Sequence, residues 1–387
     1  IADLSRSIAS VVDGFKPSQR KVIFACRKRK NTEIKVSQLA GYVSTETAYH
    51  HGEQSMMGTI IQLAQDYVGS NNMNLLLPNG QFGTRLLGGK DAASPRYIFT
   101  RLSEHALEQF HHDDDPLLDY LDDDGQKIEP KFFVPKIPLV LINGADGIGT
   151  GYSTSVPCYN PDDVKENIQR ILDNKGQKTM NPWYKDFKGK IVDNGSGHYT
   201  TFGVYKLERR YLTVTELPIG RWTQDFKEHL DKMIDIKIEG FENHSSDHKV
   251  NFRIELVPEY SKKLEEATIL KDFKLCTNLS TRNMHLFDSN NSIAKYNSPQ
   301  EIITEFVQVR LEYYAKRKKN LLANYNHSLD ILSNKIRFVR KICDEEIVIF
   351  KKQKDIIVEL LKSNKFTMFD NSYDYLLNMK IYTFTSE

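Results

Sequence analysis

The chain has 387 residues, of which 40% are hydrophobic and 27% charged, so it can bury a core and is not a disordered tail. Its 4 cysteines are far apart in sequence and form no CxxC pair, which excludes a disulfide scaffold and a zinc knuckle and fits a reducing compartment. No run of about 18 apolar residues occurs, so we expect no membrane-spanning helix. At about 150 residues per domain, the length predicts two or three domains.

The net charge is only +2, from 53 Lys and Arg against 51 Asp and Glu, but the charges are not evenly spread. Basic residues dominate residues 16–35, where Glu33 is the single acid, whereas residues 113–124 contain acids and no base. Local charge matters more than the sum when the partner is a polyanion. The basic stretch is therefore a candidate for nucleic-acid contact.

The first third of the chain predicts short helices joined by tight turns. Apolar side chains recur at helical spacing in three segments, residues 4–12, 36–43 and 57–68. Pro17 stands where a helix would begin. From residue 71 to 95 the chain is rich in Gly, Asn and Leu, with turn signals. Several helices followed by a short Gly-rich β wing are typical of a winged helix-turn-helix domain, which we expect over residues 1–135.

The middle of the chain predicts a second domain of mixed helices and strands. An apolar run at residues 132–142 is cut by prolines and followed by a Gly-rich stretch. Alternating segments at 211–217 and 251–257 favour strands, and residues 161–173 favour a helix. We expect this α/β domain to span residues 136–295.

A long helix is expected in the last part of the chain, residues 296–387. Ser298–Glu301 is a capping box with Pro299 at the first helical position. A helix from there to about Ile349 would be about 75 Å long. Its narrow apolar stripe indicates a coiled-coil partner, which must be a segment absent from this chain or another molecule. Residues 373–382 form an apolar cluster within reach of the far end of this helix.

The strongest chemical candidate is Tyr97, in the segment SPRYIFT. A deprotonated tyrosine is a good nucleophile toward a phosphodiester, and the resulting ester keeps the energy of the broken bond. Because a phenol has a pKa near ~10, Tyr97 needs a cation or a base nearby. Arg96 could donate two hydrogen bonds to the phosphate oxygens. An isolated Arg-Tyr pair, however, is more often an ordinary surface feature.

Six sequence blocks recur in the order in which they occur in one enzyme family. They closely resemble the breakage-reunion region of eukaryotic type IIA DNA topoisomerases: DGFKPSQRKV (13–22), TAYHHGE (47–53), NLLLPNGQFGTRLLGGKDAASPRYIFT (74–100), NGADGIGTG (143–151), VTELPIGRWT (214–223) and VRLEYYAKRK (309–318). The resemblance implies an α+β multidomain fold with a winged helix domain, an α/β tower domain and a long coiled-coil helix with a C-gate cluster. It also implies ATP-dependent double-strand cleavage through a 5′-phosphotyrosyl linkage, with duplex passage that changes DNA topology.

The resemblance assigns roles to residues near the tyrosine. Tyr97 matches the nucleophile and Arg96 the transition-state stabiliser beside it. His51 matches a histidine at the scissile phosphate, which could orient the nucleophile or move its proton. His50 is its neighbour, and the sequence alone does not choose between the two.

Several basic residues match DNA-binding positions of the family. Arg6 and Lys16 match residues that line the active-site groove. Arg20 and Lys21 are expected to hold phosphates, which positions the duplex without reading its sequence. Lys90, in the same block as the tyrosine, is a further expected DNA contact.

Two further segments match parts of the family that bend or contact DNA. Ile148 matches an isoleucine that wedges between base pairs, and the flanking Gly147 and Gly149 are expected to let the backbone approach DNA closely. Residues 274–283 match a DNA-contacting segment. It contributes Lys274, Arg282 and Asn283.

A run of possible metal ligands, His111 to Asp115, follows the tyrosine. Because its acids are consecutive, we expect their side chains to diverge into a solvated acidic loop, and we expect no metal ligand in this chain. The family implies Mg²⁺ and ATP for the full-length enzyme, bound outside this chain, together with double-stranded DNA, a homodimer and a nuclear location. We therefore expect a fragment, beginning without Met, that cleaves DNA poorly or not at all alone.

Two alternatives remain open at this point. A non-catalytic winged-helix protein that bends DNA would need the basic helices and Ile148 but not Tyr97. A bacterial protein of the gyrase A type would share the chemistry. The blocks TAYHHGE and VRLEYYAKRK favour the eukaryotic form.

Overall fold

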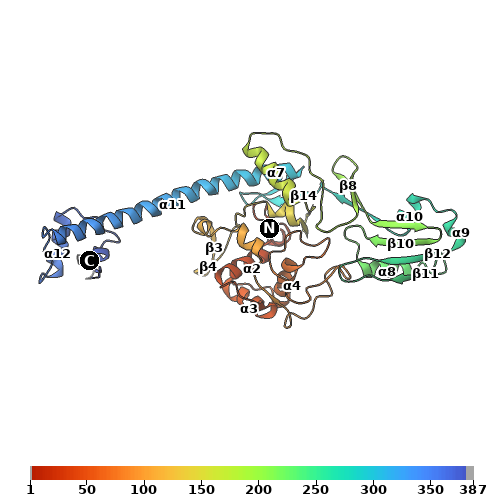
Figure 1. Ribbon diagram of the computed structural model, residues 1–387, viewed down its shortest axis with the longest axis horizontal. Helices are drawn as coiled ribbons and strands as arrows, with labels where there is room; N and C mark the ends of the chain where they lie inside the picture. Colours follow the sequence, from red (N-terminus) through yellow and green to blue (C-terminus); the bar gives the residue numbers. More distant parts are fainter. Residues whose placement is uncertain (1, 381–387) are drawn as a thin grey trace. The chain divides into compact units, whose positions relative to one another are not determined.

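The computed structural model describes residues 2–380 and mixes helices and strands, as expected (Figure 1). It divides into two compact units, Ile1–Tyr313 and Tyr314–Glu387, which are described separately. Within residues 2–380, no helix has the length and apolar character needed to cross a membrane.

Four short helices build the N-terminal part of the first unit: α1 (Ala2–Ser7), α2 (Pro17–Lys28), α3 (Val36–Glu46) and α4 (Glu53–Ala64). Helices α2, α3 and α4 pack against one another (Figure 1). Pro17 occupies the first turn of α2, and the backbone N–H of Lys16 donates to the Gln19 side chain at 2.9 Å, which closes the start of the helix. The apolar faces of these helices supply the largest core of the molecule.

The expected β wing is reduced to a minimum. Strand β1 (Ile34–Lys35) pairs with β2 (Phe99–Thr100), and the isolated bridges Leu76 to Leu102 and Asn79 to Phe99 extend the pairing. Most of the Gly-rich chain that precedes β2 forms turns and irregular loops instead of strands. The glycines favour tight turns there over extended pairing.

Short elements connect this part to the sheets of the middle region. They are α5 (Glu104–Gln109), the 3-10 helix η1 (His112–Leu117), the hairpin β3 (Tyr120–Asp123) and β4 (Gln126–Pro130), α6 (Leu139–Asn143), the hairpin β5 (Ala145–Gly149) and β6 (Tyr152–Val156), and α7 (Pro161–Leu172). Helix α7 confirms the helix predicted over residues 161–173.

Two antiparallel sheets form the middle region. The first has the order β11-β12-β10-β9 and the second β13-β8-β7. Their strands are β7 (Lys190–Asp193), β8 (His198–Phe202), β9 (Val204–Glu208), β10 (Tyr211–Glu216), β11 (Ile238–Asn243), β12 (Phe252–Leu256) and β13 (Cys276–Ser280). Helices α8 (Thr223–Asp231), α9 (Pro258–Ser261) and α10 (Glu266–Asp272) accompany them, and the chain returns through β14 (Met284–Phe287) and β15 (Ile293–Tyr296). Strands β10 and β12 confirm the two strands predicted in this region.

Residues 2–380 contain three hydrophobic cores, and the division into two units lies at 313/314, while the expected boundaries at 135/136 and 295/296 stay predictions. The first core includes the apolar run at 139–142, part of β14 and the start of the long helix, so chain on both sides of those boundaries shares one interior. The second core lies within residues 212–275. The third belongs to the second unit.

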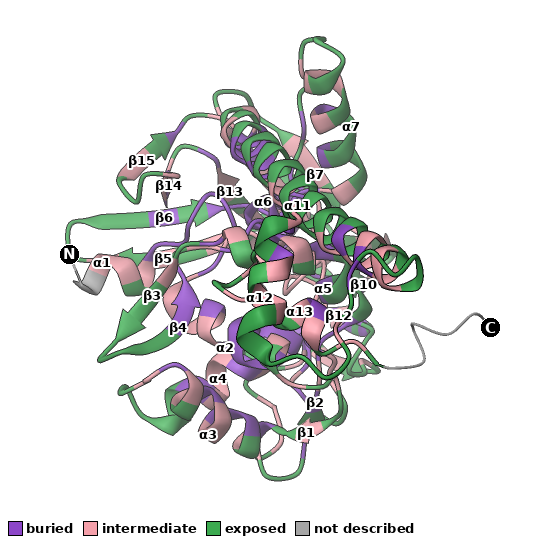
Figure 2. Ribbon diagram, turned by 90° about the vertical axis from the view of Figure 1, so that its left-hand side faces the viewer, coloured by how far each residue is buried: buried purple, intermediate pink, exposed green. Residues whose placement is uncertain are grey.

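The long helix α11 spans Pro299–Cys343, 45 residues, and ends earlier than the predicted Ile349. Its start follows the predicted cap, because the N–H of Glu301 donates to Ser298 Oγ at 3.3 Å. Its end is followed by Glu345 at φ 57°, a conformation that does not continue a helix. Much of its surface is exposed (Figure 2), including an apolar stripe: Leu322, Tyr325, Leu329, Leu332 and Ile336.

The second unit closes around the far part of α11. Helices α12 (Lys354–Ser363) and α13 (Asp374–Leu377) follow. Phe338 of α11 shares a core with Tyr373 and Leu376, so the described part of the predicted C-terminal cluster does pack on this helix. The last residues of that cluster, Ile381 and Tyr382, lie outside the described residues.

Candidate nucleic-acid interface

Tyr97 stands on an exposed turn with a buried anchor. Its backbone N–H donates to the Ser94 carbonyl at 2.9 Å, and its side chain is 73% exposed. The next residue, Ile98, is only 1% exposed and its carbonyl accepts from the N–H of Val36 at 3.0 Å. The turn is thereby fixed at the N-terminal end of α3 while the phenol and the exposed Arg96 point to solvent.

His50 and His51 lie in the loop between α3 and α4, beyond the C-terminal end of α3. Both are exposed, and the His51 ring stands edge-on to Tyr49 with a centroid distance of 5.5 Å. Within residues 2–380, no recorded hydrogen bond or ion pair joins either imidazole to Arg96 or Tyr97. Since α3 has 11 residues, its two ends lie about 16 Å apart, so the two groups of side chains flank one helix.

Ile148 is a highly exposed aliphatic residue, at 87%, on strand β5. It faces Ser153 across the hairpin β5–β6. In this strand the side chains of Asp146 and Ile148 point outward, whereas Gly147 and Gly149 are half-buried. An isoleucine gains nothing for folding from this position, so its side chain is available to another molecule.

The two flanking glycines permit a close contact within the protein. A Cβ at Gly147 would lie 1.9 Å from the carbonyl oxygen of Ser7, and a Cβ at Gly149 would lie 2.9 Å from Leu4 Cδ2. Both positions therefore face helix α1. These glycines permit a close backbone approach between the hairpin and α1, and the approach of the same backbone to DNA stays a prediction.

Lys16 ties the same hairpin to the start of α2. Its Nζ donates to the carbonyl oxygen of Asp146 at 2.7 Å, and burial lowers the pKa of this lysine, partly offset by the Asp146 carboxylate. The ammonium has two further N–H groups for a second acceptor. Arg6, on α1, is exposed. Both basic residues thus accompany the hairpin that carries Ile148.

The segment around Asn283 docks on the other strand of the hairpin. Asn283 Nδ2 donates to Ser153 Oγ at 2.7 Å, and its carbonyl accepts from the N–H of Ser155 at 2.8 Å. Arg282 is exposed, and its Nη1 lies 3.1 Å from His198 Nε2. Lys274 is also exposed, but it lies beyond the opposite end of β13 from Arg282. The structure therefore brings Asn283 to the Ile148 hairpin and leaves Lys274 apart from it.

Arg20 and Lys21 both bind carboxylates within the protein. Arg20 is 7% exposed, and its guanidinium binds both carboxylate oxygens of Asp13, at 2.7 and 3.0 Å. Lys21 Nζ lies 2.9 Å from the carboxylate of Glu129, and the lysine side chain is only 14% exposed. Both residues form internal ion pairs that hold α2 in the fold, and their expected DNA contacts stay predictions.

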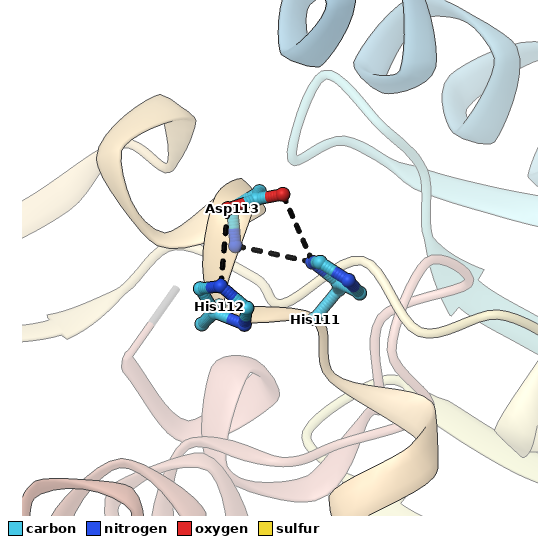
Figure 3. A group of neighbouring side chains, drawn as sticks. All are labelled: His111, His112 and Asp113. Atoms are coloured by element: carbon cyan, nitrogen blue, oxygen red, sulfur yellow. Dashed lines mark hydrogen bonds and ion pairs between the residues drawn. The ribbon is translucent and has the colours of Figure 1, made fainter. Parts of the chain in front are cut away.

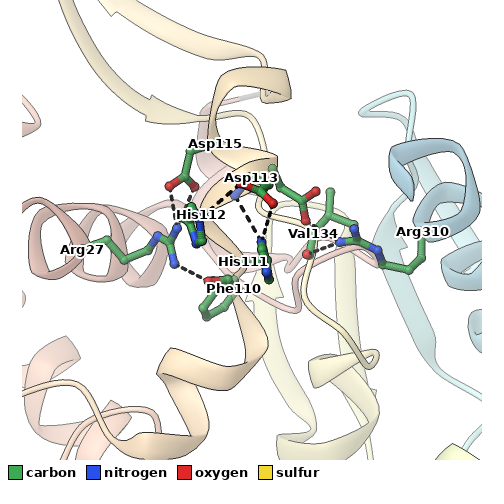
Figure 4. Close-up of polar contacts among 9 residues, drawn as sticks. Arg27, Phe110, His111, His112, Asp113, Asp115, Val134 and Arg310 are labelled. Atoms are coloured by element: carbon green, nitrogen blue, oxygen red, sulfur yellow. Dashed lines mark hydrogen bonds and ion pairs between the residues drawn. The ribbon is translucent and has the colours of Figure 1, made fainter. Parts of the chain in front are cut away.

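The rest of the basic stretch is also partly neutralised within the protein. Arg27 binds Asp115 at 2.7 Å and the carbonyl oxygen of Phe110 at 2.8 Å (Figure 4), and Lys28 binds Glu46 at 2.6 Å. The acidic run thus supplies a partner for the basic run. Charge counting along the sequence overstated the positive surface of this segment.

A junction that the sequence did not reveal fixes the loop before the tyrosine. Arg85 forms an ion pair with Glu216, and these side chains are 7% and 1% exposed. The Trp222 indole fills the place where a side chain at Gly88 would stand, since a Cβ there would lie 2.3 Å from its Nε1. Lys90, two residues later, is exposed. The sequence signals for this junction are the consecutive glycines Gly88 and Gly89 and the block at 214–223, which contains Trp222.

The described residues do not offer an oxygen-rich site of the kind that Mg²⁺ requires. Within residues 2–380, the group of His, Cys, Asp or Glu side chains that converges is His111, His112 and Asp113 (Figure 3). Two of its donors are imidazole nitrogens, whereas Mg²⁺ takes oxygen ligands. No step of the chemistry is therefore assigned to a magnesium ion held by this chain.

Chemically, the arrangement presents an exposed phenol beside a guanidinium, and separately an exposed aliphatic side chain on a hairpin held by α1, Lys16 and Asn283. In the first set, the phenol can attack a phosphodiester, and the guanidinium can stabilise the negative charge that develops on the phosphate oxygens. The second can insert between stacked bases. Both sets suit a duplex partner.

Comparison with known proteins shows the family of the chain. The family model that describes the A subunits of DNA gyrase and topoisomerase IV matches residues 6–387. DNA topoisomerase 2 of Arabidopsis thaliana is 48% identical over 379 residues, which is 95% of this chain and 26% of that protein. DNA topoisomerase 2 of Plasmodium falciparum is 42% identical, covering 100% of this chain and 30% of the relative. The chain thus spans about a quarter to a third of the curated relatives it matches.

A solved structure has the same fold. The DNA-binding, cleavage and re-ligation domain of Plasmodium falciparum topoisomerase II superposes with a TM-score of 0.92 at 42% identity, covering 99% of this chain and 57% of that one. The fold and the order of the sequence blocks therefore agree over nearly the whole length. The chain belongs to the family of DNA gyrase and topoisomerase IV A subunits, within which it is similar to the eukaryotic DNA topoisomerase 2 proteins.

Proposed function

We propose that this chain supplies the DNA breakage-reunion region of an ATP-dependent type II DNA topoisomerase. The observation that carries the proposal is the Arg96–Tyr97 turn. Its phenol is 73% exposed next to an exposed guanidinium, and the buried Ile98 holds the turn in place. Membership of the family supports assigning the nucleophile to this tyrosine.

In the proposed reaction, Tyr97 Oη attacks the phosphorus atom and the bond to the sugar 3′ oxygen breaks. The tyrosine becomes joined to the 5′ phosphate, its proton leaves, and the 3′ oxygen gains a proton. Arg96 donates to the phosphate oxygens as charge develops. His51 or His50 contacts the scissile-phosphate region and assists proton movement. Resealing is the reverse step, and the phosphotyrosyl bond supplies its energy.

The hairpin β5–β6 would bend the duplex that is cut. Insertion of Ile148 between two base pairs costs stacking but allows the DNA to contact more protein surface. Arg6, Lys16 and Arg282 would contact phosphates near the hairpin, while Asn283 positions it. Lys90 and Lys274 are exposed and remain proposed phosphate contacts.

The complete enzyme is proposed to act as a homodimer with two-fold symmetry. Each tyrosine cuts one strand, and a second duplex passes through the gap. Mg²⁺ and ATP are proposed to bind to parts of the enzyme outside this chain, so this segment alone cleaves DNA poorly or not at all. The nucleus is the proposed location.

The test is covalent trapping with the full-length protein, Mg²⁺ and duplex DNA, followed by denaturation. Wild-type protein should remain attached to DNA 5′ ends, and Tyr97→Phe should abolish the attachment. Tyr325→Phe is the matched control, because Tyr325 is also exposed, at 64%, but lies on α11. Unchanged attachment in Tyr97→Phe would refute the assignment of the nucleophile.

A DNA-bending protein without cleavage activity is the competing function. It is separated by the same experiment, since wild-type protein would then bind and bend DNA but never become attached to it. Family membership does not favour this alternative.

A further inference from the structure

Three consecutive side chains at the start of η1 converge instead of alternating. One ring nitrogen from each of His111 and His112 and a carboxylate oxygen of Asp113 lie within 4.8 Å of one another (Figure 3). His112 Nε2 is 3.2 Å from Asp113 Oδ1, and His111 Nδ1 is 3.6 Å from Asp113 Oδ2. The imidazole planes are stacked, with centroids 4.7 Å apart and an angle of 19°.

The backbone explains the convergence. His111 is extended, at φ −79° and ψ 134°, whereas residues 112–117 form the 3-10 helix. The chain changes direction between His111 and His112, so the first ring folds back over the second. A regular strand or helix would place three consecutive side chains on different faces.

The two acids that follow Asp113 form ion pairs with arginines, whereas the Asp113 carboxylate faces the two imidazoles (Figure 4). Asp114 pairs with Arg310 at 2.9 Å, where both side chains are at most 6% exposed, and Asp115 pairs with Arg27 at 2.7 Å. The three carboxylates diverge as predicted, although Asp114 is buried and is not part of a solvated loop. Within residues 2–380, the recorded ion-pair partners of Asp113 are the two histidines, and no Lys or Arg competes for its carboxylate.

We propose that His111, His112 and Asp113 bind a divalent transition-metal ion, for which Zn²⁺ is the best match. Zinc takes imidazole nitrogen and carboxylate oxygen at about 2.0–2.2 Å in a tetrahedral arrangement, which puts neighbouring ligand atoms about 3.4 Å apart. Each imidazole nitrogen lies near that distance from one oxygen of Asp113, His112 at 3.2 Å from Oδ1 and His111 at 3.6 Å from Oδ2, and all three donor atoms lie within 4.8 Å of one another. The His112 side chain is 83% exposed, so water can complete the coordination.

Metal binding would replace one weak interaction at the site. His111 Nδ1 accepts the backbone N–H of Asp113 at 3.2 Å, which caps the 3-10 helix. A metal on that nitrogen removes this hydrogen bond. The same metal joins His111 to Asp113 through the carboxylate, so the start of η1 stays restrained.

A metal at this site would affect the stability of the segment that contains it. The residues directly after it are tied to α2 through Arg27 and to the first part of α11 through Arg310. His111 and His112 also line a pocket of about 340 Å³. Zinc would therefore stabilise the segment that links these two helices, independently of the proposed cleavage chemistry.

The experiment measures Zn²⁺ binding to the full chain by competition with a chromophoric chelator, in the presence of millimolar Mg²⁺. One site per chain should weaken at least tenfold in His112→Ala and in Asp113→Asn, since loss of a ligand costs at least as much as the 10- to 100-fold seen for outer-shell partners. His105→Ala on α5 is the matched control, because His105 is also exposed but lies outside the group. It should keep the site.

X-ray absorption of the bound zinc gives a second readout. Wild-type protein should show two imidazole ligands, and His112→Ala one. Melting curves without zinc should be the same for His112→Ala and wild type, which excludes misfolding as the cause of a lost site. Equal zinc affinity in wild type, His112→Ala and Asp113→Asn would overturn the proposal, as would displacement of the zinc by Mg²⁺.

Discussion

Replacing Gly147 by Ala tests whether contact with α1 positions the hairpin that carries Ile148. The new Cβ would lie 1.9 Å from the Ser7 carbonyl oxygen and 2.9 Å from its carbonyl carbon. Both atoms belong to the backbone, so no side chain can rotate away. The helix or the hairpin must move by about 1.5 Å to restore an ordinary contact, and such overpacking costs about 1–3 kcal/mol.

Two measurements follow this change. Urea unfolding should show the loss of stability, and energy transfer across a doubly labelled duplex should show reduced bending, because the hairpin has moved. Gly240→Ala is the matched control: it is also in a strand, β11, and a Cβ there meets nothing within 4 Å. If Gly147→Ala resembles Gly240→Ala in both stability and bending, the contact with α1 does not position the hairpin.

Three further predictions test other features. Ile148→Ala should bind bent duplex about 60-fold more weakly without any loss of folding stability, since three lost carbons at about 0.8 kcal/mol each remove about 2.4 kcal/mol. Ile236→Ala, at a residue that is also exposed, at 70%, should bind as wild type in the same titration. Glu216→Ala should lower the unfolding free energy by about 3–5 kcal/mol, because it leaves the buried charge of Arg85 without its partner; a change below about 1 kcal/mol in denaturant unfolding would contradict this. Burial raises the pKa of the Cys26 thiol from near 9 to about 12, so the unfolded chain loses this proton first as pH rises. This thiol should not change stability below pH 8 and should contribute a loss of about 1.4 kcal/mol by pH 10. Burial also raises the pKa of Cys158 to about 12, so Cys26→Ala should remove the share of Cys26 and keep the rest of the fall, as measured by denaturant unfolding at pH 8 and pH 10.

The sequence predicted the helix starts, because a proline or a capping residue at the start of a helix acts on its immediate neighbours. Pro17, Pro161 and Pro299 each begin a helix as expected, since a proline fixes the backbone of a first turn without losing a needed hydrogen bond. The long helix was predicted from its cap and its apolar spacing. Its last turns were placed too far along, because a break such as the one at Glu345 involves no glycine or proline.

Features that depend on distant partners could not be read from the sequence. The sequence does not show that Asp13 binds the Arg20 guanidinium, or that α1 lies against Gly147. The exposed Tyr97 and Ile148 were predicted through the family motifs, and their exposure agrees with the roles proposed for them. The contacts that hold the strand of Ile148 come from distant parts of the chain, as in the hydrogen bond from Lys16 to Asp146.

The junction at Arg85 also has a mechanical consequence. The N–H of Thr223 donates to the Arg85 carbonyl at 3.2 Å, and that of Gln224 to the Leu86 carbonyl at 3.0 Å, so main chain is fastened to main chain between helix α8 and the loop that leads to Tyr97. Because both bonds join backbone to backbone, a displacement of α8 would be passed to the loop before Tyr97 and could not be absorbed by the rotation of a side chain.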